Sequence, residues 1–285
     1  MSDTPDRLSS VRQLFDLTGR IAVITGGAGM LGMKYAEAIA EMGGIPVLVD
    51  LQAEQCRQVE QHIRQRFNCE AFGLPTDITS KQQVQQMVQQ VMNRYGRIDI
   101  LINNAALTVK GGAAAFDDYF APFDEYPEEL FEMALRVNLT GALLVTQAVG
   151  RIMTGQHRGV IVNIASDVAL ISPDHRIYEG MKTGEANKPF NTPIAYSMSK
   201  AAILAFTRYL ATYWADKGIR VNALSPAGVY DNHDPEFVRR LSQLIPIGRM
   251  AHKDEYQGAI LFLVSDASSF MTGANLVVDG GRTAW

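Results

Sequence analysis

Short apolar runs alternate along this chain with longer segments in which apolar residues recur at helical spacing. The clearest runs are Arg20–Thr25, Ile45–Asp50, Ile98–Asn103 and Val160–Ile164, and each is almost continuously apolar. Runs of this kind are typical of strands that are covered on both faces in a parallel sheet. The alternation therefore predicts an α/β fold with a doubly wound parallel sheet of about seven strands and helices on both faces.

The same alternation places the other elements and predicts a single domain over residues 1–285, with 1–17 as a polar lead-in. Further strands are expected at Ala71–Leu74, Ile219–Leu224 and Asn275–Val278. Helices are expected from the first glycine-rich turn to Glu41, and at Ala53–Phe67, Ser80–Tyr95, Pro127–Met153, Ile194–Lys217, Pro235–Leu244 and Lys253–Val264, with Ser80 as a cap.

Composition excludes several classes of protein. Of the 285 residues 47% are hydrophobic and 20% charged, and a net charge of −4 argues against a nucleic-acid binder. Two cysteines, Cys56 and Cys69, provide no disulfide framework and suit a reducing cytoplasm. No signal peptide is visible, and no apolar run reaches the ~18 residues of a membrane span. Five dispersed histidines lack ligand spacing, so no metal site is predicted.

The turn after the first strand indicates a dinucleotide site. Gly27, Gly29 and Gly32 have the spacing of the dinucleotide fingerprint between a strand and a helix. Glycine is needed there because a Cβ would block the tight turn and keep the backbone away from the pyrophosphate. Asp50 ends the second strand, 18 residues after Gly32, and no Lys or Arg occupies the turn. An acid at this place accepts hydrogen bonds from ribose hydroxyls and repels a 2′-phosphate, so we expect NAD rather than NADP.

A second group of residues indicates proton-transfer chemistry. Tyr196 and Lys200 lie four positions apart and share one face of the predicted helix. An ammonium group and a positive nicotinamide ring favour the phenolate, so this pair suits proton exchange with an alcohol. Ser166 follows a strand end, where it could polarise a carbonyl, and Asn138 is a polar residue in the middle of a predicted helix. Each of these features taken alone also occurs as ordinary surface or turn structure.

Together these motifs resemble the short-chain dehydrogenase/reductase family, of the single-domain type with a Rossmann-like sheet, from about residue 18 to the carboxyl end. The resemblance implies that Tyr196 is the acid/base, that Lys200 lowers its pKa and holds the ribose, that Ser166 binds the reacting oxygen and that Asn138 holds a relay water. It also implies a homotetramer. The cofactor contacts that it implies are Gly26, Gly29, Met30, Leu31, Gly32, Asp50, Leu51, Asp77, Ile78, Asn104, Ala105, Ala106, Tyr196, Lys200, Pro226 and Val229.

The chain departs from the usual family pattern near the cofactor. Met30, Ala106 and Ala227 stand where the family usually has glycine, and Tyr230-Asp231 replaces a common threonine. These departures leave the four catalytic positions intact. The segment Tyr209–Arg249 is also similar to bacterial members of surface-sugar and flagellin-glycan pathways.

Two stretches, 107–124 and 171–193, are longer than in the plain family form and are predicted to be substrate loops. Their polarity favours a hydrophilic, sugar-like substrate, and Arg176 or Lys182 would suit a phosphate or carboxylate. Contacts between subunits are the alternative use of these loops. The substrate residues expected from the second loop are Asp174, His175, Arg176, Tyr178 and Lys182.

The sequence thus predicts an NAD-dependent oxidoreductase acting on a secondary alcohol or ketone of a sugar-like small molecule, with a place in carbohydrate metabolism. One alternative is a 3-oxoacyl carrier-protein reductase, which should prefer NADPH and show basic residues near the turn. An alternative of another class is a catalytically inactive nucleotide-sensing protein. The intact set of Asn138, Ser166, Tyr196 and Lys200 argues against the latter.

Overall fold

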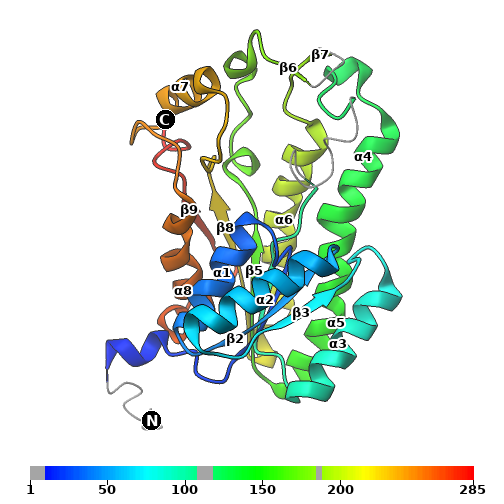
Figure 1. Ribbon diagram of the computed structural model, residues 1–285, viewed down its shortest axis with the longest axis vertical. Coiled ribbons are helices and arrows are strands. Elements are labelled where there is room, and N and C mark those ends of the chain that lie inside the picture. Colours follow the sequence, from blue (N-terminus) through cyan, green and yellow to red (C-terminus); the bar gives the residue numbers. More distant parts are fainter. Residues whose placement is uncertain (1–9, 108–117, 184–187) are drawn as a thin grey trace.

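The computed structural model describes residues 10–107, 118–183 and 188–285. Its centre is a seven-stranded parallel sheet with the strand order β3-β2-β1-β4-β5-β8-β9 (Figure 1). This confirms the predicted sheet and its number of strands. The strands are β1 (Ile21–Thr25), β2 (Ile45–Asp50), β3 (Phe72–Pro75), β4 (Ile100–Asn103), β5 (Gly159–Ile164), β8 (Ile219–Pro226) and β9 (Asn275–Val278).

Helices cover both faces of this sheet, as the fully buried strands require. One layer is formed by α1, α2 and α8, and the other by α3, α5 and α6. The helices are α1 (Met30–Glu41), α2 (Ala53–Phe67), α3 (Lys81–Tyr95), α4 (Glu128–Leu135), α5 (Ala142–Gln156), α6 (Ile194–Tyr213), α7 (Pro235–Gln243) and α8 (Gln257–Val264).

Two hydrophobic cores lie on opposite sides of the sheet, because successive side chains of a strand point to opposite faces. In β1, Ala22 and Ile24 belong to the core under α1 and α8, whereas Ile21 and Val23 belong to the core under α3, α5 and α6. All four residues are at most 2% exposed. The sheet is therefore held from both sides, and its strand ends are fixed in position.

The helix predicted over Pro127–Met153 is not continuous, and this corrects the sequence-based expectation. Between α4 and α5 the chain makes a π-helical turn over Arg136–Gly141, centred on the buried Asn138. The Asn138 amide forms its hydrogen bonds with residues outside its own helix. π-Helical turns of this kind are frequent at functional sites. Other helix ends differ by one turn: α6 stops at Tyr213, and a 3₁₀ turn over Lys253–Tyr256 precedes α8.

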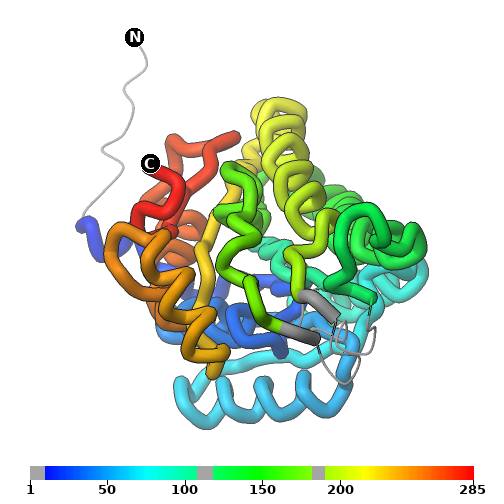
Figure 2. Tube along the Cα trace, turned by 90° about the horizontal axis from the view of Figure 1, so that it is seen from above, coloured from blue at the N-terminus to red at the C-terminus, as the bar shows by residue number. Residues whose placement is uncertain are grey.

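The second long loop folds back on the first. It contains a 3₁₀ turn (His175–Tyr178) and an antiparallel pair that the sequence did not indicate, β6 (Lys182–Thr183) with β7 (Lys188–Pro189). The Phe190 ring stacks on Phe120 with centroids 4.2 Å apart, so the two predicted loops pack together. Figure 2 shows the segment before β6 running between α7 and the start of α6. Of the first loop, 108–117 lies outside the described residues, as do 1–9 of the lead-in.

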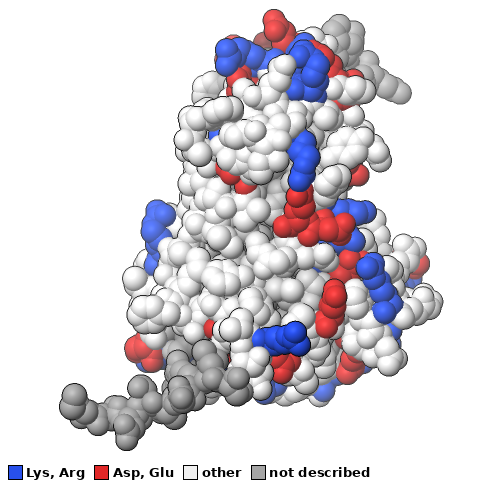
Figure 3. Space-filling model, turned by 90° about the vertical axis from the view of Figure 1, so that its left-hand side faces the viewer, with Lys and Arg blue, Asp and Glu red and all other residues white. Residues whose placement is uncertain are grey.

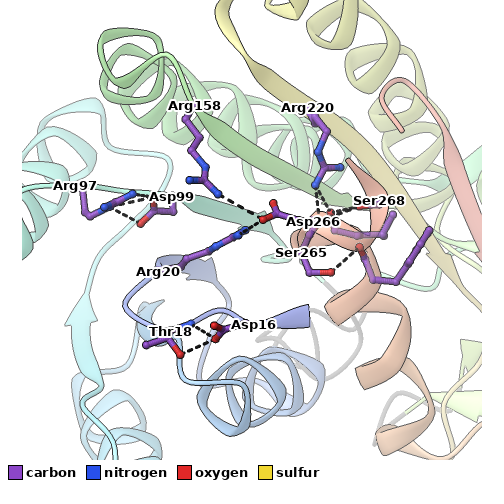
Figure 4. Close-up of polar contacts among 12 residues, drawn as sticks. Asp16, Thr18, Arg20, Arg97, Asp99, Arg158, Arg220, Ser265, Asp266 and Ser268 are labelled. Carbon is purple, nitrogen blue, oxygen red and sulfur yellow. Dashed lines mark hydrogen bonds and ion pairs between the residues drawn. The ribbon is translucent and has the colours of Figure 1, made fainter. Parts of the chain in front are cut away.

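Charged residues gather at the edge of the sheet where the parallel strands begin, opposite the edge formed by their carboxyl ends (Figure 4). Asp266 forms ion pairs with Arg20 at 2.6 Å and with Arg158 at 3.7 Å. Arg220 of β8 donates hydrogen bonds to the carbonyl oxygens of residues 263, 265 and 271. Every one of these groups is satisfied within the fold, so this edge stabilises the sheet and leaves the carboxyl edge for a site.

Candidate active site

The glycine-rich turn at the end of β1 is built around close backbone approaches. Gly26 has a φ of +62°, and a Cβ added there would lie 2.9 Å from the Nδ2 atom of Asn104. A Cβ on Gly32, in the first turn of α1, would lie 2.0 Å from the Gly26 carbonyl oxygen. The turn therefore accepts only glycine at these positions. Without side chains there, a pyrophosphate group can approach the amino terminus of α1.

Asn104 fixes this turn from the neighbouring strand. Its Nδ2 donates to the carbonyl oxygens of Thr25 at 3.0 Å and Gly26 at 3.1 Å. The Thr25 Oγ1 in return accepts hydrogen bonds from the backbone N–H groups of Asn104 and Ala105. The structure thus gives Asn104 a bracing contact with the turn, in addition to the adenosine contact that the sequence predicts.

The Asp50 carboxylate lies beside the same turn. Its Oδ2 accepts a hydrogen bond from the Ala28 N–H at 3.2 Å, and its Oδ1 accepts one from Leu51 N–H at 2.8 Å. Asp77 accepts from both the N–H and the hydroxyl of Thr79 at 2.8 Å. Two carboxylates thus stand at adjacent strand ends, where a nucleoside could bind.

The other expected cofactor residues fall at the same edge. Met30 is the first helical residue of α1, so glycine is not required there by backbone conformation. Pro226 is the last residue of β8, and Val229 forms an isolated bridge with Ala251. The remaining expected contacts lie in or next to the turn or after the strands: Gly29, Leu31, Ile78, Ala105 and Ala106.

Tyr196 and Lys200 lie in the first turns of α6, with Lys200 Nζ 5.6 Å from the centroid of the tyrosine ring. Lys200 is buried, and its Nζ donates a 2.7 Å hydrogen bond to the carbonyl oxygen of Ile164, the last residue of β5. Ser166 follows two residues later and lies close enough to the Tyr196 phenol to affect its pKa. The structure thus brings these three side chains together.

Asn138 joins this group through α6. Its Nδ2 donates to the Ser199 hydroxyl at 2.9 Å, and that hydroxyl donates to the Tyr196 carbonyl oxygen at 2.9 Å. Its Oδ1 accepts a hydrogen bond from the Leu107 N–H at 2.7 Å. One buried amide therefore links the π-helical turn, the end of the β4 loop and the helix that carries the tyrosine.

Burial dominates the acid–base properties of the pair. It raises the pKa of Tyr196 to about 12, against an opposing effect of the hydrogen bond with Ser166, while the charge of Asp167 raises the pKa further. Burial also lowers the pKa of Lys200 to about 8. Without a bound ligand the protein therefore favours a neutral phenol, and the sequence-based expectation of a phenolate depends on charges that a ligand brings.

A buried ion pair beside Ser166 is absent from the sequence-based expectations. The Ser166 hydroxyl donates to Asp167 Oδ1 at 2.8 Å, and Arg282 Nε binds Asp167 Oδ2 at 2.9 Å. The two charged side chains are 9% and 5% exposed. A charged residue directly after Ser166 was a usable signal, but its partner stands 115 positions away.

A cavity of about 410 Å³ opens next to these residues, between the two long loops. Val168, two residues after Ser166, and Ile194 and Ser197, which flank Tyr196, contribute to its wall, although Ser166 and Tyr196 do not line it. The hydroxyls of Tyr126 and Ser197 are buried without a hydrogen-bond partner in the described chain. Its polar lining consists of Tyr126, Ser172, His175, Asn191, Thr192 and Ser197.

Of the four expected substrate residues whose side chains the structure describes, only His175 lines this cavity. Arg176 is exposed and paired with Asp174 at 2.7 Å, which lowers the pKa of that carboxyl to about 2. Tyr178 is part of the aromatic packing between Phe190 and α7. The side chain of Lys182 lies outside the described part of the molecule.

Other kinds of site are not found among the described residues. No group of three or more His, Cys, Asp or Glu side chains in residues 10–107, 118–183 and 188–285 is arranged to hold a metal ion. Within the same residues, every helix is too short or too polar to span a bilayer.

Comparison with known proteins gives a consistent family. The short chain dehydrogenase family model matches residues 20–184, and a model described as enoyl-(acyl carrier protein) reductase matches 181–283. The chain is 33% identical to an NAD-dependent glycerol dehydrogenase of Listeria innocua, over 94% of this chain and 96% of the relative. It is 32% identical to a D-threitol dehydrogenase of Mycolicibacterium smegmatis (94% and 95%) and 29% identical to a 3-oxoacyl-(acyl-carrier-protein) reductase of Aquifex aeolicus (93% and 98%).

Solved structures agree with this grouping. An NAD⁺-bound xylitol dehydrogenase superposes with a TM-score of 0.79 at 32% identity, covering 93% of this chain and 99% of that one. A gluconate 5-dehydrogenase from Burkholderia cenocepacia, in complex with NADP and tartrate, superposes with a TM-score of 0.83 at 30% identity, covering 97% and 100%. Both dinucleotides therefore occur among structures similar to this chain.

Proposed function

The chain belongs to the short-chain dehydrogenase/reductase family, and from this premise we propose that it is an NAD-dependent oxidoreductase that interconverts a secondary alcohol and a ketone in a neutral, sugar-like polyol. The observation that carries the proposal is the grouping of Ser166, Tyr196 and Lys200, with a cavity next to them that Lys, Arg, Asp and Glu do not line in the described chain. A family likeness alone would not select the substrate, so the cavity is what supports that part of the proposal.

The choice of NAD rests on Asp50. The turn has the glycine cradle that a dinucleotide needs, and Asp50 lies against it with its carboxylate fixed by two N–H groups. A carboxylate there accepts hydrogen bonds from ribose hydroxyls and disfavours an additional phosphate. When bound, the nicotinamide ring supplies or accepts the hydride. The residues that we expect to hold the dinucleotide are those of the Gly26–Gly32 turn, Asp50, Asp77, Asn104 and Lys200.

The side chains of the site have different roles in the proposed proton transfer. In carbonyl reduction, the Tyr196 hydroxyl gives its proton to the substrate oxygen, and in alcohol oxidation its phenolate takes that proton. Ser166 hydrogen-bonds the same oxygen and fixes its place. The Lys200 ammonium favours the phenolate. Asn138 retains the expected role of holding a relay water, and its amide positions α6 through Ser199.

The lining of the cavity favours a neutral polyhydroxy substrate. Hydroxyl, amide and imidazole groups from six residues line it beside seven apolar residues, and none of its lining residues, all within the described chain, is Lys, Arg, Asp or Glu. Tyr126 and Ser197 carry buried hydroxyls without a hydrogen-bond partner in the described chain, and rotation of either side chain toward the cavity would offer a polyol a hydrogen bond. Since Arg176 is exposed and already paired, we no longer assign it a phosphate or carboxylate. The names of the glycerol, threitol and xylitol dehydrogenase relatives point the same way.

The test is a screen of NAD⁺ and NADP⁺ reduction over C3–C6 polyols, sugars and sugar phosphates, with NADPH-dependent reduction of 3-oxoacyl thioesters in parallel. We expect turnover of a polyol with NAD⁺. Activity confined to thioesters would favour a 3-oxoacyl carrier-protein reductase, which a relative at 29% identity keeps in view. Tight NADH binding without turnover of any compound would favour the nucleotide-sensing alternative.

We further propose a homo-oligomer in the cytoplasm. Strand β9 ends the sheet as an uncharged edge, and Val277, Phe270 and Trp285 are exposed near it. Figure 3 views the side on which α7, α8 and β9 lie, and a broad central area there carries few charged side chains. Uncovered edges and apolar patches of this kind favour association. Both cysteines are free thiols, which suits a reducing compartment.

A further inference from the structure

The cavity between the two long loops has an inner end and an outer end. The inner end is formed by Ile194 and Ser197, which flank Tyr196 in α6. At the outer end, Phe123 is 79% exposed and Ser172 is also exposed to solvent. A substrate that reacts at Tyr196 and continues into this cavity would therefore extend from the reacting groups to the protein surface.

This cavity is larger than a simple polyol requires. Its volume of about 410 Å³ lies within the range of about 300–1,000 Å³ that is typical of pockets for drug-sized ligands. At roughly 30 Å³ for each water molecule, it has the volume of about a dozen waters. A three- or four-carbon polyol with its reacting carbon at Tyr196 would leave most of this space to solvent. The size thus indicates a substrate that has a second part beyond the polyol.

The lining suits a ligand that is both apolar and hydroxylated. Seven of the lining residues are apolar, among them the consecutive Ala121, Pro122 and Phe123, and the other six carry hydroxyl, amide or imidazole groups. Apolar walls favour C–H surface, whereas a hydrocarbon chain would leave the polar groups without hydrogen bonds. A pyranose ring offers both an apolar C–H face and a rim of hydroxyls. Since Lys, Arg, Asp and Glu do not line the cavity in the described chain, an uncharged ring fits best.

The outer part of the cavity is formed by the two long loops, which are held together by direct contacts. The Phe190 ring stacks on Phe120 at 4.2 Å, and Asn191 Nδ2 donates a 3.3 Å hydrogen bond to the Phe120 carbonyl oxygen. The hydroxyl of Thr192 lies 3.1 Å from the hydroxyl of Tyr178. Both Asn191 and Thr192 line the cavity, so its wall is fixed before a ligand binds. A preformed wall reduces the entropy that binding costs.

From the volume, the lining and the position of this cavity, we infer that the substrate is a polyol that carries a second, uncharged sugar ring, and that the outer part of the cavity binds this ring. The polyol lies between Tyr196 and the inner end of the cavity, beside Ser197, and the ring lies between the two long loops. This inference rests on the proposed function, because it names the substrate of the same site.

The first test compares D-glucitol with two of its glucosides, maltitol and isomaltitol, which attach the glucosyl ring at different carbons. Initial rates of NAD⁺ reduction give kcat/KM for each compound. We expect at least one glucoside to exceed D-glucitol by about tenfold or more, mainly through a lower KM, because the ring adds buried apolar surface and hydrogen bonds. Equal values for the three compounds, or a preference for D-glucitol, overturn the inference and leave the proposed function standing.

Two substitutions at the outer end should reduce this preference. Phe123→Ala removes aromatic surface, so the ratio of kcat/KM for the preferred glucoside over D-glucitol should fall about five- to tenfold. Ser172→Trp fills the outer end and should abolish the preference. Both residues are exposed, so the fold should tolerate the changes. Tyr213→Ala, which truncates a 62% exposed aromatic residue at the far end of α6, is the matched control and should keep the wild-type ratio. Wild-type ratios in both cavity variants overturn the inference.

A binding measurement without turnover separates this inference from the proposed function. Methyl α-D-glucopyranoside contains the ring without the polyol, and saturation-transfer NMR detects its contact with the protein in the absence of a dinucleotide. We expect a signal with the wild type and with Tyr213→Ala, and its loss with Ser172→Trp. No signal with the wild type, or an unchanged signal with Ser172→Trp, overturns the inference. A signal that behaves as expected, without turnover of any compound, overturns only the proposed function.

Discussion

The Lys200 ammonium donates its hydrogen bond to the backbone carbonyl oxygen of Ile164 at 2.7 Å, and this contact ties helix α6 to the end of strand β5. Tyr196 stands one turn earlier on the helix, and Ser166 stands two residues later in the chain than the carbonyl. The lysine therefore holds in place the two side chains that we propose to bind the substrate oxygen, in addition to supplying a positive charge.

Lys200→Met should remove this cation and change how stability depends on pH. Burial lowers the pKa of Lys200 from 10.5 to about 8, so between these values the unfolded chain binds the proton that the native protein has lost. Wild-type stability should therefore rise relative to the variant by roughly 3 kcal/mol from pH 8 to 10.5, and be flat below pH 8. Urea unfolding of both proteins at several pH values measures the difference. A difference that does not change across this window would contradict the burial of a charged lysine.

Tyr196→Phe should abolish proton transfer while leaving the dinucleotide site intact. We expect kcat to fall by about 10²- to 10⁴-fold, and NADH affinity to stay within about twofold. Steady-state kinetics and NADH fluorescence titration give the two values. Substantial activity in this variant would sink the proposed mechanism.

Two helical glycines should respond in opposite ways to alanine. In Gly32→Ala the new methyl group would lie 2.0 Å from the Gly26 carbonyl oxygen, so the turn must open, with a loss of about 1–3 kcal/mol and of NADH binding. A methyl group on Gly258 of α8 would meet no atom within 4 Å, so Gly258→Ala should stabilise by about 0.5–1 kcal/mol. Thermal melts and NADH titration compare them. Equal NADH affinity in the two variants would show that the close approach does not shape the site.

Asp50→Asn should weaken the discrimination against NADP. The amide can still bind the Ala28 N–H but no longer repels a 2′-phosphate, so the ratio of kcat/KM for NAD⁺ over NADP⁺ should fall at least about tenfold. Glu54→Gln, on the exposed face of α2, removes a nearby charge and serves as the control with an unchanged ratio. If both variants keep the wild-type ratio, Asp50 does not select the cofactor.

The partnerless hydroxyls of the cavity give a test of the substrate class. Ser197→Ala removes a hydroxyl that has no hydrogen-bond partner in the described protein, so the melting temperature should stay the same or rise. KM for a polyol should increase about five- to tenfold, which corresponds to one lost hydrogen bond. In contrast, Ser199→Ala removes a bonded hydroxyl and should lower stability. An unchanged KM in Ser197→Ala would place the substrate elsewhere.

The sheet could be read from the sequence because burial on both faces leaves an unambiguous apolar pattern. Ile45–Asp50, Ala53–Phe67 and Asn275–Val278 have the same bounds in the structure as in the prediction. The π-helical turn at Asn138 could not be read, since it depends on partners at Leu107 and Ser199 that are distant in the sequence. The short β6–β7 pair has too few residues to show any periodicity.

The site was predictable where local geometry demands a residue type, and unpredictable where it depends on long-range pairing. Gly26 and Gly32 are required by backbone approaches within one turn, so their spacing reveals them. The place of Arg282 in the site could not be predicted, because only the fold brings it to Asp167. The pairing of Arg176 with Asp174 could not be predicted, because it depends on the conformation of the two side chains.

The pairing of β1 with β4 forms the boundary between two parts of the molecule that can be exchanged separately. Strands β1–β3 carry the residues proposed to select the dinucleotide, and the chain after β4 carries those proposed for the substrate. A chimaera between relatives cut near this seam should combine the coenzyme of one parent with the substrate of the other. Such a cut must inherit Thr25 and Asn104 as a matched set, because their hydrogen bonds cross it. Recombination between gene segments would be expected to respect the same junction.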